Sequence, residues 1–158
     1  MLRSLIKKIL LTGLALTLMA STSILSIPST AEAYSPWTRS YSDDELWLLA
    51  RVVYAEAEGE PYLGKVAIAA VVLNRVDSTL FSDTIAGVIY EPWQFSCVGN
   101  WMFNSHPSRD SIAAAREALN GHDPTGGALY YWNYHQVTNP WLWSKPTATV
   151  IGNHWFAY

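Results

Sequence analysis

The first strong pattern in the chain is a helical repeat of apolar positions that begins after Ser42. In the stretch "LWLLARVVYAEA" the apolar residues recur every three to four positions, which places them on one face of a helix. Ser42 followed by Glu45 forms the pair of a capping box, and Gly59 is suited to end a helix. We therefore predict a helix from Ser42 to about Ala57.

Three further helices are predicted from the stretches that follow, at residues 61–77, 83–90 and 108–120. Residues 61–77 begin with a proline, which suits a first helical turn, and their centre, 66–73, is apolar on all sides. The β-branched residues of this centre also allow a strand, but its length and its alanines favour a buried helix. Residues 83–90 indicate a short helix, and residues 108–120, closed by a glycine, indicate a third long one.

The last part of the chain favours strands. The segment "ALYYW" at 128–132 predicts one strand, and "TATVI" and "HWFAY" flank Gly152 and Asn153, a two-residue hairpin signal. Residues 93–108 contain Gly, Asn and Pro and predict a long loop, a kind of segment that is often functional in a small domain. Helices followed by a small antiparallel sheet are typical of an α+β domain.

Three glutamates in "VVYAEAEGEPY" are separated by the helical period. At about 100° per residue, Glu56 falls inside the apolar stripe and Glu58 falls on the opposite, polar face. Glu60 lies beyond Gly59, where it can cap the next helix or flank Pro61. We expect Glu58 to be a solvated surface charge, Glu60 a helix-start residue, and Glu56 to be directed toward the interior.

An inward carboxyl group is suited to acid catalysis. Burial among apolar groups favours the protonated form, which is the form that donates a proton to a glycosidic oxygen. A structural role, such as accepting hydrogen bonds from loop amides, is the alternative for Glu56. The spacing alone makes Glu56 a candidate for catalysis and leaves both roles open.

The N-terminal 33 residues have the form of a secretory signal peptide. Three basic residues precede the apolar run 9–20, and a small-x-small motif follows at 31–33. A membrane anchor is the alternative, but the apolar run is short for a span. We expect cleavage after Ala33, export without stable membrane insertion, and an unstructured lead-in over residues 34–41.

Charge and cysteine content limit the function further. The chain has 13 acidic against 10 Lys and Arg residues, and three of the basic residues lie in the leader, so the remainder is acidic and does not favour nucleic acid as a partner. Cys97 is the only cysteine, which excludes an internal disulfide and suggests a small buried apolar group. The 8 Trp and 9 Tyr residues offer rings that stack on sugars, although many must be core.

Several stretches, in this order, resemble one known family. They are "LLARVVYAEAEGEPYLGKVAIAAVVLNRVDS", "TIAGVIYEPWQFS", "AAAREALNGHDPTGGALYYWN" and "WLWSKPTATVIGNHWFAY". They resemble the spore cortex-lytic enzymes, which are cell wall hydrolases of the SleB and CwlJ type, over residues 42–158. Position 58, where relatives commonly have a basic residue, and the loop "CVGNWMFNSHPS" depart from the family.

The resemblance implies a fold, an activity and a catalytic residue. It implies a lysozyme-like helical lobe followed by a small antiparallel sheet, acting on peptidoglycan in spore cortex or cell wall. It implies a lytic transglycosylase that cuts the MurNAc–GlcNAc bond to give 1,6-anhydroMurNAc, with Glu56 as the family glutamate. Hydrolysis by a muramidase or glucosaminidase is the alternative, with Glu91 or Asp123 as a second carboxylate.

Substrate contacts are expected from aromatic and amide side chains, because rings stack on sugars and amides bind N-acetyl groups. The candidates are Gln94, Phe95, Tyr130, Tyr131, Asn133, Trp141 and Trp143. Tyr130 and Trp132 lie on one face of their strand and Tyr131 on the other, so one set belongs to the core.

A zinc amidase and a non-catalytic wall-binding module are the alternative functions. A zinc amidase would need clustered ligands, but His106, His122, His135 and His154 are scattered. A wall-binding module without catalysis would use the same aromatic residues. We expect no metal or other cofactor, although similarity to the CwlJ branch allows calcium, and we expect a secreted monomer in the cell wall or spore envelope.

Overall fold

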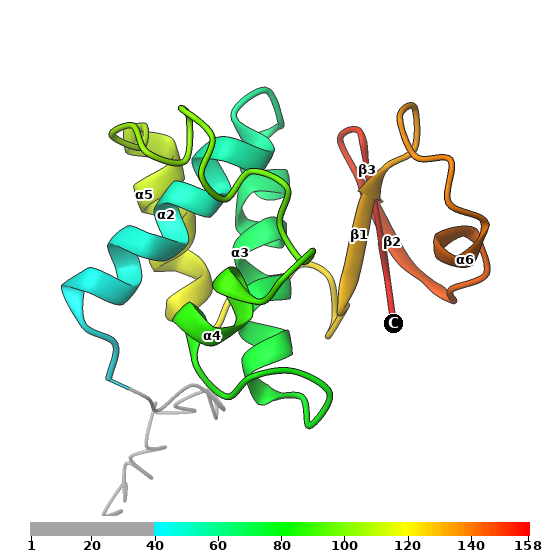
Figure 1. Ribbon diagram of the computed structural model, residues 1–158, viewed down its shortest axis with the longest axis horizontal. Coiled ribbons are helices and arrows are strands. Elements are labelled where there is room, and N and C mark those ends of the chain that lie inside the picture. The colour runs from blue at the N-terminus through cyan, green and yellow to red at the C-terminus, as the bar shows by residue number, and fades with distance from the viewer. Residues whose placement is uncertain (1–39) are drawn as a thin grey trace, which may run out of the picture. The chain divides into compact units, whose positions relative to one another are not determined.

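The computed structural model describes residues 40–158, and the expected signal peptide lies outside them. Figure 1 shows two parts: a group of helices and, beside it, a small sheet. The helices are α2 (Asp43–Ala57), α3 (Tyr62–Asp77), α4 (Ile85–Tyr90) and α5 (Arg109–Leu119). The sheet contains β1 (Tyr130–Asn133), β2 (Thr147–Ile151) and β3 (His154–Ala157), with the short helix α6 (Pro140–Trp143) between β1 and β2. The predicted α+β class is confirmed.

A local signal sets the start of α2 as expected. The Ser42 hydroxyl accepts the amide of Glu45 at 3.2 Å, and the Glu45 carboxylate accepts the amide of Ser42 at 2.8 Å, which completes the capping box of α2. These bonds satisfy amides that the first turn of a helix leaves without partners. The prediction of a helix rather than a strand at 61–77 is confirmed, because α3 continues unbroken through its apolar centre.

Helix α3 forms the centre of the core. Every residue from 66 to 73 is buried, and α3 contacts α2, α4 and α5 on one side and β1 and β2 on the other. A helix surrounded by neighbours in this way has no solvent face, so its sequence is apolar all round. Between residues 40 and 158, no helix is both long and apolar enough to cross a membrane.

The sheet is antiparallel with strand order β1-β3-β2. Gly152 and Asn153 join β2 to β3 as the hairpin signal predicts. Strand β1 begins at Tyr130, two residues later than predicted, opposite Ala157 at the end of β3. Just before it, the Leu129 amide donates to the Ala157 carbonyl at 2.9 Å, and the Ala128 carbonyl accepts a hydrogen bond from the Asn74 side-chain amide at 3.1 Å. The sequence patterns did not predict α6, which Figure 1 shows on the side of the sheet away from the helices.

Candidate active site

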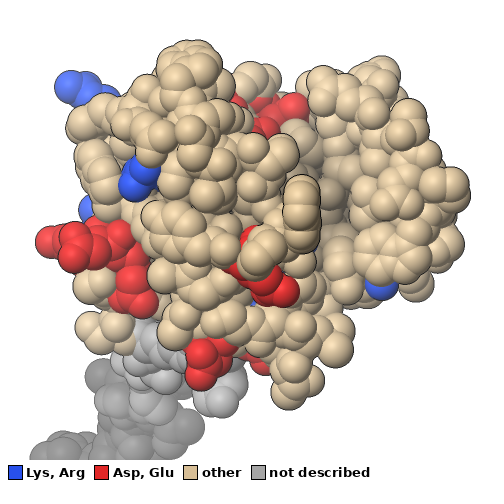
Figure 2. All heavy atoms as spheres, in the orientation of Figure 1, with Lys and Arg blue, Asp and Glu red and all other residues tan. Residues whose placement is uncertain are grey.

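A cleft of about 580 Å³ opens between the helices and the sheet. Its walls come from the end of α2, from α3, from the loop that includes residues 93–100, and from β1 and β3. Figure 2 shows that the surface between the helices and the sheet is hollowed and that acidic atoms, drawn red, lie at its upper and left edges. A concave site that collects polar groups from several elements is the usual form of a small-ligand or saccharide site.

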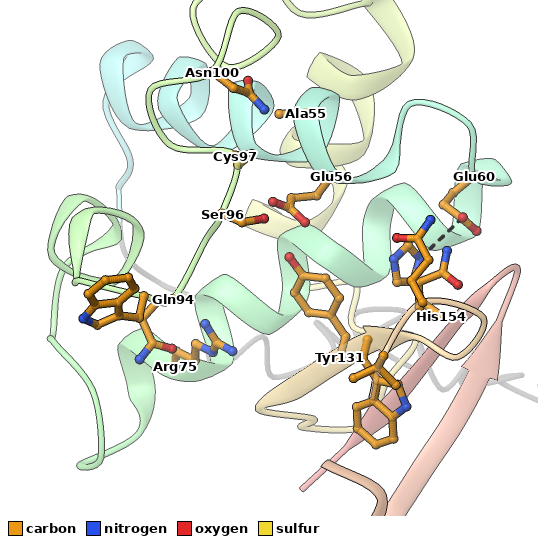
Figure 3. A pocket seen from close by; sticks show the side chains of 15 residues that line it. Ala55, Glu56, Glu60, Arg75, Gln94, Ser96, Cys97, Asn100, Tyr131 and His154 are labelled. Atoms are coloured by element: carbon orange, nitrogen blue, oxygen red, sulfur yellow. Dashed lines mark ion pairs between the residues drawn. The ribbon is translucent and has the colours of Figure 1, made fainter. Parts of the chain in front are cut away.

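Glu56 lies at the end of α2 and lines this cleft. Its side chain is half-buried, on a helix whose other inward residues include Leu49, Val52 and Val53. Figure 3 shows the Tyr131 hydroxyl, which comes from β1, directed toward the Glu56 carboxylate. The helical period therefore placed Glu56 on the side of α2 that faces the cleft.

The two groups that face Glu56 retain their protons. Burial raises the pKa of Tyr131 well above its ordinary value, and the Glu56 carboxylate raises it further. Burial also raises the pKa of the Cys97 thiol, with a second contribution from Glu56. A neutral phenol and a neutral thiol are hydrogen-bond donors, so both can donate to Glu56 when it is anionic. Cys97 is buried as expected, and it also lines the cleft.

Glu60 does not cap α3, which corrects its predicted role. Pro61 is the N-cap residue of α3, where no side chain makes a capping bond, and the Glu60 carboxylate turns to the hairpin. It accepts the backbone amide of Asn153 at 2.9 Å and the Asn153 side-chain amide at 3.1 Å. Its oxygen lies 3.5 Å from Nδ1 of His154 (Figure 3). Glu60 thus joins the α2–α3 turn to the β2–β3 hairpin.

Glu58 lies at the surface, but it is not simply a solvated charge. Its carboxylate accepts hydrogen bonds from the hydroxyls of Ser108 at 3.1 Å and Ser111 at 3.4 Å, and it lies 3.5 Å from Nζ of Lys65. The side chain is 40% exposed, so its ion pair with Lys65 is screened by solvent. Glu58 therefore connects the end of α2 to the start of α5 and does not line the cleft.

His154 is a buried cleft residue that the sequence patterns did not single out. Burial lowers its pKa, an effect that the carboxylates of Glu60 and Glu56 oppose in part. Its Nδ1 lies near Glu60 but makes no well-aligned hydrogen bond, and its ring packs edge-on against Tyr131 with 5.5 Å between centroids. The hairpin signal of Gly152 and Asn153 was the one feature of the sequence that indicated the position of His154.

Protonation of His154 is expected to destabilise the fold. Because the folded pKa lies below the ordinary value of 6.5, the unfolded chain binds this proton more readily. The contribution of neutral His154 to the free energy of unfolding is fully present above pH 6.5. It is lost as the pH falls from 6.5 through the lowered pKa of the folded state. We expect the free energy of unfolding in urea to fall as the pH is lowered below 6.5, and to fall less for His154→Gln. An equal decline in both proteins would contradict this assignment.

The two carboxylates expected to assist hydrolysis lie elsewhere. Burial alone would raise the pKa of Asp123, but hydrogen bonds from Thr125, Asn74 and the Gly127 amide lower it overall, and these bonds hold the turn before β1. Glu91 lines a neighbouring pocket of about 530 Å³. Among the described acidic residues, Glu60 is the one that lines the cleft together with Glu56.

The expected substrate-binding residues separate into three groups: those that line the cleft, those that line a neighbouring pocket, and those that line neither. Gln94, Tyr131 and Asn133 line the cleft of Glu56. Tyr130 and Trp141 line the neighbouring pocket, in which Gln94 and Tyr131 also take part.

Phe95 and Trp143 line neither pocket. The expected place of Phe95 in the groove is wrong, and that of Trp143 stays a prediction. Phe95 is buried in the hydrophobic core, where the Arg75 guanidinium lies 5.2 Å from its ring centroid. Trp143 packs edge-on against Trp132 and Trp155, with centroids 5.6 Å and 5.3 Å apart. Phe95 therefore fills apolar space in the core, whereas Trp143 is 44% exposed on α6. Residue type alone does not distinguish these two surroundings from sugar contact.

Arg75 is a further cleft residue that the patterns did not identify. It is 5% exposed, and its Nε donates to the Leu129 carbonyl at 2.8 Å. Burial lowers its pKa, and it packs against the rings of Phe81 and Tyr130. A charged residue at the end of an otherwise apolar helix was the signal that could have marked it.

Within residues 40–158, no three His, Cys, Asp or Glu side chains gather closely enough to hold a metal ion. Calcium, which the CwlJ-type resemblance allows, stays a prediction, and no step below depends on a metal.

Residues 59–157 match the family model described as Cell Wall Hydrolase. The chain belongs to the cell wall hydrolase family. It is 47% identical over 116 residues to a spore cortex-lytic enzyme of Halalkalibacterium halodurans, a match that covers 73% of this chain and 35% of that protein. It is also 29% identical over 116 residues to the cell wall hydrolase CwlJ of Bacillus subtilis, covering 69% of this chain and 81% of that one. The resemblance drawn from the sequence motifs is thus confirmed.

Two solved SleB catalytic domains share this fold. The SleB catalytic domain of Bacillus cereus is 45% identical, with a TM-score of 0.72, and the match covers 76% of this chain and 94% of that one. A domain described as a germination-specific lytic transglycosylase, SleB of Bacillus anthracis, is 44% identical with a TM-score of 0.72, covering 76% and 98%. The match spans only 35% to 45% of the length of the spore cortex-lytic enzymes first aligned with this chain.

Proposed function

We propose that this protein cleaves the glycan strands of peptidoglycan as a lytic transglycosylase, with Glu56 as the catalytic acid. The observation that supports the proposal is the difference between the partners of the two carboxyl groups in the cleft. Glu60 is bound to the Asn153 amides, whereas Glu56 faces the cleft and two neutral donors, Tyr131 and Cys97. The name of the Bacillus anthracis relative supports the same reaction class.

One carboxyl group is sufficient for the proposed reaction. Glu56 donates its proton to the oxygen between MurNAc and GlcNAc, and the bond from that oxygen to C1 of MurNAc breaks. The C6 hydroxyl of the same MurNAc then attacks C1 and gives its proton to Glu56, which forms the 1,6-anhydro sugar and restores the acid. Because the nucleophile belongs to the same sugar, its effective concentration is high and no bound water is needed.

The remaining cleft residues have binding roles in this proposal. The amides of Gln94 and Asn133 can pair with N-acetyl groups, since each offers both a donor and an acceptor. Donation from Tyr131 and Cys97 stabilises the Glu56 carboxylate between the two proton transfers. Secretion, a cell wall or spore envelope location and a monomeric state are part of the same proposal.

Hydrolysis is the second candidate, because Glu60 also lines the cleft and is a carboxylate. In that case Glu60 would activate water, and the product would be a muramidase or glucosaminidase product with a reducing end. Its bonds to Asn153 oppose this role, since both of its oxygens are already occupied.

The products distinguish the two reactions. We expect mass spectrometry of purified peptidoglycan digested with this protein to show anhydro-muropeptides, each lighter than the hydrolytic product by one water. Digestion with mutanolysin, a hydrolytic muramidase, is the matched control. Reducing ends without anhydro-muropeptides would overturn the transglycosylase assignment and favour hydrolysis.

A further inference from the structure

Trp93 combines two unfavourable features. Its side chain is 99% exposed, and its φ of 71° makes it the one non-glycine residue between 40 and 158 in the left-handed region. A bulky side chain is disfavoured in that region, and a fully exposed indole forgoes the stabilisation of burial. Neither feature helps the fold, so both indicate that the ring serves a ligand.

The backbone explains how Trp93 is presented. The Gln94 amide donates to the Glu91 carbonyl at 3.3 Å, which closes a turn with Pro92 at its second position and Trp93 at its third. A proline followed by a positive φ is the pattern of a type II turn, whose third position strongly favours glycine. A glycine would therefore relieve the strain at position 93, and the tryptophan is explained by what its side chain can bind.

Trp93 lies where two cavities meet. It lines the cleft of Glu56 and also the neighbouring pocket walled by Tyr130 and Trp141. Tyr130 and Trp141 pack edge-on, with 5.2 Å between ring centroids, so the second pocket also presents aromatic surface. Gln94, the next residue, lines both cavities too and is seen beside Arg75 in Figure 3.

We propose that Trp93 is a stacking platform for one sugar of the glycan strand and that the neighbouring pocket is a second saccharide subsite on that strand. This inference rests on the proposed function. The C–H face of a pyranose is apolar and packs against an indole ring, and the ring's free exposure leaves it accessible. Because the neighbouring pocket shares Trp93 and Gln94 with the Glu56 cleft, the saccharide in that pocket would belong to the same glycan strand that Glu56 cuts.

An exposed tryptophan also suits the interface of a lipid bilayer, and this outcome is part of the test. The observations favour the glycan, because Trp93 shares its surroundings with the catalytic cleft rather than with a separate apolar surface. Trp101 provides a matched control, since it is 73% exposed in the same loop region and lines neither pocket.

The test compares Trp93→Gly, Trp93→Phe and Trp101→Ala with the unaltered protein. Cleavage is measured in the active protein, and binding to insoluble peptidoglycan sacculi is measured with Glu56→Gln also present. We expect Trp93→Gly to be at least as stable to urea as the parent but to bind sacculi about tenfold more weakly, with KM raised more than kcat is lowered. Trp93→Phe should lose less, and Trp101→Ala should bind and cleave normally.

The outcomes are separable. Normal sacculus binding and KM for Trp93→Gly, in a protein that still cleaves peptidoglycan, would overturn the platform and leave the proposed function intact. Failure of the unaltered protein to cleave or bind sacculi would instead overturn the proposed function. Loss of binding to phosphatidylglycerol–phosphatidylethanolamine vesicles, with unchanged sacculus binding, would replace the glycan with a membrane surface.

Discussion

Glu56→Gln is expected to lower the rate of peptidoglycan cleavage by about a thousandfold, because a carboxamide cannot donate the proton that the glycosidic oxygen requires. Glutamine has nearly the shape of glutamic acid and can still accept a hydrogen bond from Tyr131. Binding to sacculi and the free energy of unfolding should therefore change little. The measurement is the release of soluble muropeptides under single-turnover conditions.

Glu58→Gln is the matched control for this loss. It replaces the same residue type at the same end of α2, but Glu58 lies outside the cleft and contacts Ser108, Ser111 and Lys65. We expect near-normal cleavage and a loss of stability of at most about 1 kcal/mol, since the carboxylate is partly exposed. Cleavage by Glu56→Gln at the rate of this control would exclude Glu56 as the acid and assign the proton donation to another residue, whereas sacculus binding without any cleavage by the unaltered protein would favour a wall-binding module.

Gly152→Ala is expected to lower the free energy of unfolding by about 3 kcal/mol, because position 152 has a left-handed backbone and no space. Its φ is +59°, and an added Cβ would lie 2.1 Å from a Glu60 carboxylate oxygen and 2.8 Å from Cδ of Pro61. The Glu60 side chain would have to move and give up its bonds to Asn153. Urea unfolding, followed by circular dichroism, measures this loss.

Gly59→Ala tests whether the loss is specific to the hairpin. No atom lies within 4 Å of the position that its Cβ would occupy, and its φ is not left-handed. The same substitution there should leave stability unchanged or raise it by about 0.5 kcal/mol, since alanine restricts the unfolded chain. Equal effects at positions 59 and 152 would show that the contact between Glu60 and the hairpin contributes little.

The sequence alone determined the features that depend on neighbours a few residues apart. The capping box of Ser42 and Glu45, the buried centre of α3 and the Gly152–Asn153 hairpin all followed from local propensity and periodicity. The helical period also turned Glu56 to the inner side of α2, because residues on a regular helix keep a constant angle to one another.

Only the tertiary structure decided which residues meet in the cleft. Glu60 and Asn153 are 93 positions apart, so no local pattern could show that this carboxylate holds the hairpin rather than a helix end. The same applies to Phe95, which the fold takes into the core, and to Trp93, which a strained turn leaves in solvent. Whether an aromatic ring is core or surface depends on the shape of the space that distant segments leave around it, and periodicity along the chain carries no information about that space.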